Sequence, residues 1–151
     1  MKEKVTLKQV YHKERGQSLV ELALTLLIIL TLLAGTVDLG MAFFSYVALR
    51  DAAQEGALYG SINPDTDGIR DRVKSSSSTP IDFSAFPDED IGVQIVGNAC
   101  QGLTNGEPNG VQVTVTYDYI LTMPFIGAIL DTNKIPLTAS VTDTILTPAC
   151  P

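Results

Sequence analysis

The pattern of apolar and polar residues predicts one long helix in the N-terminal part of the chain. Between Leu19 and Leu49 only two residues are charged, and Leu22–Val37 is a run of sixteen residues without any charge. Thirty-one helical residues would reach roughly 46 Å, whereas the hydrocarbon core of a bilayer is about 30 Å thick. The first proline is Pro64, so nothing forces an earlier break. We therefore expect a helix over residues 17–61 that is transmembrane in its first half.

After this helix the pattern changes to short elements. Ile69 and Val73 lie four residues apart among charged residues, which predicts a short amphipathic helix over residues 68–75. Its N-terminus would be capped by Asp65 or Asp67.

Period-two alternation predicts three half-buried strands further along the chain. They cover residues 91–96, 111–117 and 137–145, and the second could run on to Leu121. Residues 124–130 are expected to form a short helix or a loop. A small antiparallel sheet laid against the long helix would bury the apolar faces of both. The expected fold class is therefore α+β.

The distribution of charge gives the expected orientation of the long helix. Residues 1–15 carry five Lys or Arg and two acids, whereas residues 16–151 carry five and fifteen, within a total net charge of −7. Lys and Arg beside a span stay in the cytoplasm, so we expect the N-terminus inside and the C-terminal part outside. The basic cluster directly precedes the apolar segment, which argues against nucleic-acid binding. A buried core helix or a cleaved secretory signal would explain this combination of charge asymmetry and length less well.

The most specific motif lies where the basic leader meets the apolar helix. It reads Arg15-Gly16-Gln17-Ser18-Leu19-Val20-Glu21. Glycine leaves the backbone open to a protease, and Glu21 places a carboxylate one turn into an apolar helix. Such a carboxylate is costly in a membrane, so it needs a partner or must snorkel to the lipid headgroups.

This junction resembles the cleavage region of type IV prepilins. That superfamily is cut after a glycine by a membrane-embedded prepilin peptidase on the cytoplasmic face, and the fifth residue of the mature chain is typically Glu. Counted from Gln17, the fifth residue here is Glu21. The resemblance implies cleavage between Gly16 and Gln17. It also implies that Glu21 pairs with the free α-amino group of a neighbouring subunit and sets the axial register of assembly.

Residues 15–60 resemble the TadE-type pseudopilins of the tight-adherence (Flp) pilus system. The pattern is the hydrophobic helix, then Asp38-Leu39-Gly40, and then the stretch Leu49–Gly60, which reads LRDAAQEGALYG. Met41 and Gln54 stand where family members often have arginine, so no role of those arginines is carried over.

The resemblance implies a minor pilin or pseudopilin with a pilin-like α+β fold that acts in pilus assembly. It divides the chain into a basic leader (1–16), a long helix (17–61) and an exported C-terminal α+β domain (62–151). The implied partners are the prepilin peptidase, other pilins and pseudopilins, pilus assembly platform proteins and the lipid bilayer. The protein would be a single-pass protein of the cell membrane, or part of an extracellular pilus. The alternative is an uncleaved, signal-anchored extracellular domain with a binding or structural role.

Small residues recur at helical spacing in the second half of the long helix. They are Ala52, Ala53, Gly56, Ala57 and Gly60. Such residues let two backbones approach closely, either in an assembly or against the chain's own C-terminal domain. Asp38, Gly40 and Glu55 are assigned to the same packing region. Asp51 and Glu55 repel each other at their four-residue spacing, so we expect one of them to pair elsewhere, for instance with Arg50 of another subunit.

Cys100 and Cys150 are the two cysteines of the chain, and both lie in the part expected outside. An oxidising compartment favours a disulfide between them, and two unpaired thiols are the alternative.

We expect neither an enzyme nor a cofactor. His12, the one histidine, lies in the leader, so residues 17–151 cannot form a Ser-His-Asp or Cys-His arrangement. The stretch from Asn63 to Gly68 resembles the opening of a calcium loop, but its twelfth position is Lys74, where a bidentate Glu is needed. A helix-capping turn explains the stretch better, and no metal site is expected. A membrane-anchored enzyme would require a cluster of titratable groups in a pocket.

Overall fold

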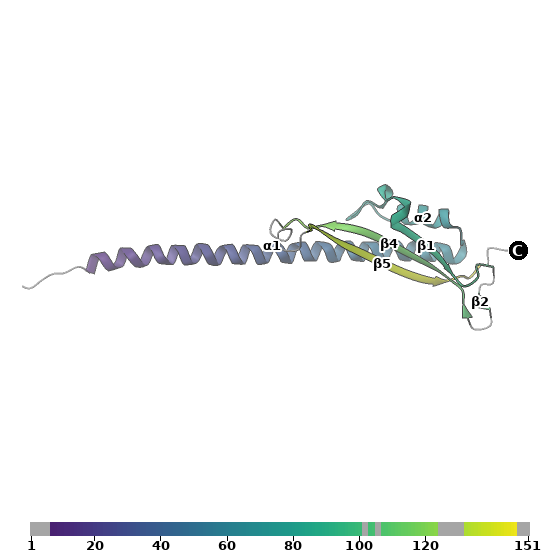
Figure 1. Ribbon diagram of the computed structural model, residues 1–151, viewed down its shortest axis with the longest axis horizontal. Helices are drawn as coiled ribbons and strands as arrows, with labels where there is room; N and C mark the ends of the chain where they lie inside the picture. Colours follow the sequence, from purple (N-terminus) through teal and green to yellow (C-terminus); the bar gives the residue numbers. More distant parts are fainter. Residues whose placement is uncertain (1–6, 101–102, 105–106, 124–131, 148–151) are drawn as a thin grey trace, which may run out of the picture. The chain divides into compact units, whose positions relative to one another are not determined.

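The computed structural model describes residues 7–100, 103–104, 107–123 and 132–147, and its fold class is α+β, as predicted (Figure 1). The helices are α1 (Leu7–Ile62), α2 (Thr66–Lys74) and the short 3-10 helices η1 (Phe83–Ala85) and η2 (Asp88–Asp90). The strands are β1 (Ile91–Val96), β2 (Leu103–Thr104), β3 (Glu107–Pro108), β4 (Gly110–Ile120) and β5 (Lys134–Thr144). The chain divides into two compact units, Met1–Leu39 and Gly40–Pro151, and each is described by itself.

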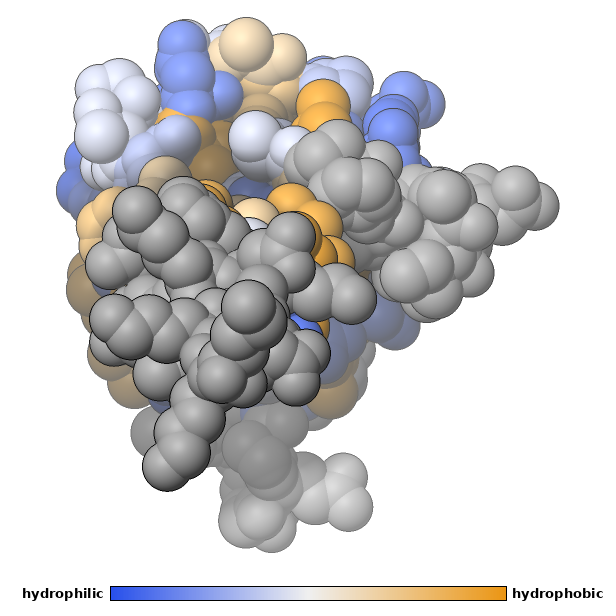
Figure 2. Space-filling model, turned by 90° about the vertical axis from the view of Figure 1, so that its left-hand side faces the viewer, coloured by the Kyte–Doolittle hydropathy of each residue, from blue (hydrophilic) through white to orange (hydrophobic). Residues whose placement is uncertain are grey.

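The first unit consists of the N-terminal part of α1 and exposes its apolar side chains. Among the described residues, one helical segment, Gly16–Ile62, is long and apolar enough to cross a membrane. The hydroxyls of Thr25, Thr31 and Thr36 donate to the carbonyl oxygens four residues earlier, at 2.8, 2.8 and 2.9 Å. Each hydroxyl is thereby paired within the helix, as a lipid environment requires. Figure 2 views the molecule from one end, and both hydrophobic and hydrophilic side chains of the described residues are visible on that face.

The second unit contains a three-stranded antiparallel sheet in the order β1-β4-β5 (Figure 1). The three predicted strands are confirmed, with β4 ending at Ile120 and β5 beginning at Lys134, earlier than expected. The register aligns Ile91 with Val115 and Val115 with Ala139, all of which are buried. One face of the sheet is therefore apolar, as the alternation predicted.

The core of this unit is formed where the C-terminal part of α1, helix α2 and the sheet meet. Its fully buried side chains include Leu49, Ala53 and Ala57 of α1, Ile69 and Val73 of α2, Phe83 of η1, and Val111, Val113 and Val115 of β4. The predicted contact of the sheet with the long helix is thus present, and it removes apolar faces of both elements from water.

Helix α2 begins at Thr66, two residues before the predicted start, and Asp65 is its N-cap. The Asp65 carboxylate accepts a hydrogen bond of 2.9 Å from the backbone N–H of Gly68. This contact satisfies one of the free N–H groups at the start of the helix. The prediction for residues 124–130 lies outside the described residues.

Candidate processing and assembly sites

The predicted cleavage junction is helical and exposed. Nothing apart from the local helix lies within 4 Å of a Cβ built on Gly16, and the side chain of Glu21 is exposed. The amide of Gln17 donates to the Glu21 carboxylate over 3.5 Å, which is long for a hydrogen bond. The Glu21 carboxylate therefore retains most of its capacity to accept further hydrogen bonds.

The other residues assigned to helix packing fall into different environments. Asp38 is buried, with 6% of its surface exposed. Gly40 is exposed, and a Cβ at this position would meet no heavy atom within 4 Å outside the local helix. Gly40 is thus available for contacts that Asp38 is not.

The small-residue face of α1 packs on the chain's own domain. Ala52, Ala53, Gly56 and Gly60 are all buried. A Cβ at Gly56 would lie 2.5 Å from Val73 Cγ2, and a Cβ at Gly60 would lie 2.9 Å from Ile69 Cδ1 and from Val111 Cγ1. Of the two alternatives for these residues, the structure shows packing within the chain. The glycines let α2 and β4 approach the backbone of α1 closely.

Glu55 forms an ion pair within the chain. Its carboxylate accepts a hydrogen bond from the guanidinium of Arg72 on α2. Arg72, which the sequence did not single out as a partner, thereby compensates the charge of Glu55, whereas Asp51 has no ion-pair partner among the described residues. Arg50 remains exposed, and in the described part of the chain it has no ion-pair partner.

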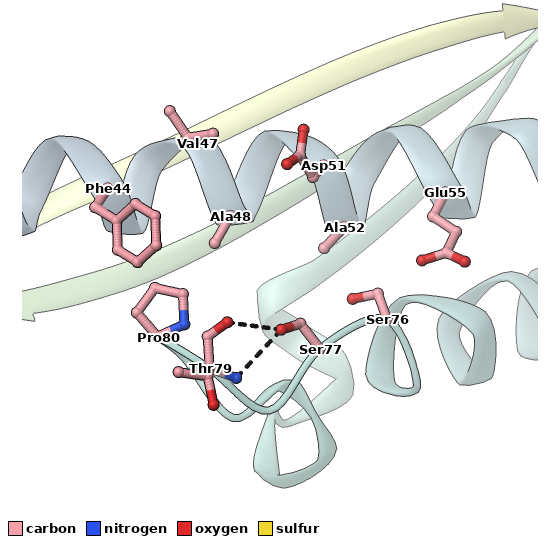
Figure 3. A pocket seen from close by; sticks show the side chains of 10 residues that line it. All are labelled: Phe44, Val47, Ala48, Asp51, Ala52, Glu55, Ser76, Ser77, Thr79 and Pro80. Atoms are coloured by element: carbon pink, nitrogen blue, oxygen red, sulfur yellow. Dashed lines mark hydrogen bonds between the residues drawn. The ribbon is translucent and has the colours of Figure 1, made fainter.

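A groove of about 290 Å³ lies between α1 and the loop that follows α2 (Figure 3). On the α1 side it is lined by Phe44, Val47, Ala48, Asp51, Ala52 and Glu55, and on the loop side by Ser76, Ser77, Thr79 and Pro80. The Ser77 hydroxyl donates to the carbonyl of Thr79 over 2.8 Å and accepts from its N–H over 3.2 Å, which fixes the loop wall. The sequence has no local signal that shows which part of α1 this loop will face.

Lys74 forms an ion pair with Asp88 of η2 at 2.6 Å. The hydrogen bond from Lys74, and then its positive charge, lower the pKa of the exposed Asp88 carboxyl below its ordinary value. Lys74, which stands at the twelfth position of the calcium-like stretch, therefore pairs with Asp88. Among the residues that the structure describes, no group of three or more His, Cys, Asp or Glu side chains is placed to hold a metal ion.

Cys100 is exposed in the turn after β1, where its N–H donates to the Asn98 side chain over 2.9 Å. Cys150 lies outside the described residues. The disulfide between the two therefore stays a prediction.

Together these features define an α+β protein with a long N-terminal apolar helix that is suited to anchor it in a membrane. Residues 16–58 match the model of the family described as TadE-like protein, which confirms the resemblance of this segment to the TadE-like family. The match begins at Gly16 and covers the apolar helix and the small-residue stretch as far as Leu58, so that Gly60 lies outside it. No curated protein and no solved structure gives a significant match to the chain.

Proposed function

We propose that this chain is a TadE-like pseudopilin, or minor pilin, of the tight-adherence (Flp) pilus system. A prepilin peptidase would cleave it between Gly16 and Gln17, and the mature chain would then act in pilus assembly. The observation that carries the proposal is the family match over residues 16–58, which begins at Gly16 itself and includes Glu21 at the prepilin spacing.

The exposed position of Glu21 supports a role for its carboxylate in assembly. Among the described residues its side chain has only the long contact with Gln17. In a lipid environment an unpaired carboxylate is costly, so the group gains from a positive partner. Cleavage after Gly16 creates such a partner, because it leaves a free α-amino group on Gln17. Pairing of this amine in one subunit with Glu21 in the next would fix the axial register.

The charge pattern supports a single-pass protein with the N-terminus in the cytoplasm and the C-terminal domain outside. The basic leader precedes the span, and Arg50 is the one basic residue in the twenty that follow Leu49. Its partners would be the peptidase, other pilins and pseudopilins, the assembly platform proteins and the bilayer. The protein would lie in the cell membrane, and copies that are incorporated would pass into the pilus.

The mass of the mature chain tests the cleavage step. We expect chains purified from cells that make the peptidase to begin at Gln17, and a Gly16→Leu variant to retain the leader. Gly40→Leu is the matched control, because both glycines are exposed and open around the Cβ position. An unchanged N-terminus in the wild-type chain would favour the alternative, an uncleaved signal-anchored extracellular domain.

A Glu21→Gln variant separates cleavage from assembly. It removes the charge and keeps the volume, so we expect normal cleavage but loss of pilus formation or of incorporation. Asp71→Asn on α2 is the control, because Asp71 is also an exposed acid and lies outside the family match. Full pilus assembly by Glu21→Gln would contradict the assigned role.

A further inference from the structure

Asp51 is an exposed acid without an ion-pair partner in the described part of the chain, and it lies on the rim of the groove. Figure 3 shows Asp51 and Val47 at the outer side of α1, Phe44 beside Pro80, and Glu55 at the opposite end of the groove. Asp51 and Glu55 also line a second, shallower hollow together with Gln54 and Leu58. Asp51 and Glu55, the acidic pair, therefore border both the groove and this second hollow.

The negative charge of Asp51 and Glu55 is only partly compensated by nearby positive charge. Two carboxylates four residues apart on a helix repel each other, and Arg72 compensates only Glu55 directly. A second cation beside Asp51 would remove the remaining repulsion. The walls of the groove also suit the aliphatic part of a long side chain, because Phe44 and Pro80 offer apolar surface.

The chain itself carries one cation suited to this surface. Five Lys or Arg residues follow Gly16. Arg70, Arg72, Lys74 and Lys134 form ion pairs, with Asp67, Glu55, Asp88 and Asp118 respectively. Arg50 forms none among the described residues, and its side chain is exposed on the same helix as the acidic pair.

We propose that the groove beside Asp51 and Glu55 binds Arg50 of a second copy of this chain. Within one copy, the side chains of Arg50 and Asp51 cannot pair, because consecutive residues on a helix point about 100° apart. In two copies whose α1 segments run parallel and side by side without an axial shift, however, residues 50 and 51 differ by only about 1.5 Å in level. The register in which the Gln17 amine meets Glu21 displaces one copy by four residues, about 6 Å, so its Arg50 lies level with the stretch between Asp51 and Glu55 of the next copy.

Such a contact is heterologous, because each copy gives its arginine to one neighbour and receives an arginine from another. Contacts of this kind generate a ring or a continuing row of copies rather than a two-fold symmetric pair. The inference rests on the proposed function only for the side-by-side arrangement and the axial register of subunits. Beyond the proposed function, it names a second copy as the partner and assigns the contact to Arg50, Asp51 and Glu55, which lie outside the Glu21 region.

Photo-cross-linking of the full chain in cell membranes tests the contact. A benzoylphenylalanine placed at Gln54, which is exposed beside the two acids, leaves both acids, Arg50 and the hydrogen bonds of the loop wall unchanged. We expect an adduct of two copies, with the attachment mapped by mass spectrometry to the helix turn around Arg50 of the second copy. An adduct with a different protein at this position, or no adduct between copies, would overturn the proposal.

Charge reversal makes the test specific. Arg50→Glu and Asp51→Arg should each lower the adduct yield about fivefold, since exposed ion pairs are modest in strength. The double variant should restore it, because each copy then carries the exchanged charges. Asp71→Arg, a reversal at an exposed acid of α2, is the control and should leave the yield unchanged. If neither single reversal weakens the adduct, the contact is overturned. It is also overturned if the double variant keeps its melting temperature but does not restore the adduct.

The N-terminal mass of the same samples keeps the two proposals apart. A chain that is cleaved at Gly16 and enters pili, but gives no adduct, would refute the groove contact alone. A chain that keeps its leader and forms no pili, but gives the charge-dependent adduct, would refute the pilin function and retain the contact.

Discussion

Glu55 of α1 and Arg72 of α2 form an ion pair between side chains that are 35% and 49% exposed. The pair joins two helices whose contact residues are seventeen positions apart in the sequence. It lies at the rim of the buried contact that Gly56 makes with Val73. Charge pairing and close packing thus act on the same pair of helices, and their contributions can be measured separately.

Removing the ion pair should cost little stability. A double-mutant cycle with Glu55→Gln and Arg72→Gln should give a coupling free energy of about 0.2–1 kcal/mol, because both side chains are partly in water. Urea unfolding of the full chain in detergent measures it. The Lys134–Asp118 pair, which is longer at 3.5 Å and more exposed, should give a smaller value. A larger coupling for the second pair would contradict this ranking.

Adding a side chain at Gly56 should cost much more. In Gly56→Ala the new Cβ would lie 2.5 Å from Val73 Cγ2, so α2 or the Val73 side chain must shift. We expect a loss of about 1–3 kcal/mol of unfolding free energy, the usual cost of overpacking. Gly40→Ala is the control, because its Cβ would meet open space, and it should be neutral or stabilising by about 0.5–1 kcal/mol. Equal effects of the two substitutions would show that the close packing at Gly56 is unimportant.

The pairing of Lys74 with Asp88 predicts a specific dependence on pH. The pKa of Asp88 is lowered in the folded chain, first by the hydrogen bond from Lys74 and then by its charge. A lowered pKa stabilises the fold at pH values above the ordinary pKa of an unfolded Asp, and this contribution is lost as the pH falls through the folded-state pKa. Lys74→Met should therefore raise the pKa of Asp88 toward its ordinary value.

Carboxyl NMR titration of Asp88 checks this prediction. Lys134→Met serves as the control, because it removes a cation from a different ion pair and should leave the Asp88 titration curve unchanged. An Asp88 titration midpoint that is the same with and without Lys74 would contradict the assignment of cause.

Periodic signals in the sequence were sufficient for most of the fold. The alternation of Val111, Val113 and Val115 placed one face of β4 in the core, and the spacing of Ile69 and Val73 located α2. Such patterns work because the backbone repeat alone determines which side chains share a face. The same local reasoning limited the cap to Asp65 or Asp67, and the structure shows Asp65, since a cap acts on the first turn of its own helix.

Partners across the fold were not predictable in the same way. The spacing of Gly56 and Gly60 fits close packing on another subunit as well as on α2 and β4, and only the tertiary structure distinguishes these alternatives. The choice of Arg72 for Glu55 depends on how α2 turns back along α1. The groove wall at Ser77 has no sequence signal at all, because a polar loop gives no indication of the surface that it will face.

The predicted disulfide between Cys100 and Cys150 should tie the end of the chain to the turn after β1. The backbone N–H groups of Leu146 and Thr147 already donate to the carbonyl of Ser61, at 2.8 and 3.2 Å, so the chain after β5 starts beside the end of α1. A bond from Cys100 to Cys150 would close a loop of about fifty residues, which corresponds to about 4 kcal/mol in the chain-entropy account of disulfides.

Cys100→Ser, Cys150→Ser and the double variant should therefore lose the same amount of unfolding free energy, at most about 4 kcal/mol, because each removes the same bond. Equal losses distinguish a disulfide from two thiols that pack independently, whose effects would add. Urea unfolding of the full chain with and without reductant measures the loss, and reductant should bring the wild-type chain to the level of the variants. Alkylation of both cysteines in native chain isolated without reductant would show that the bond does not form.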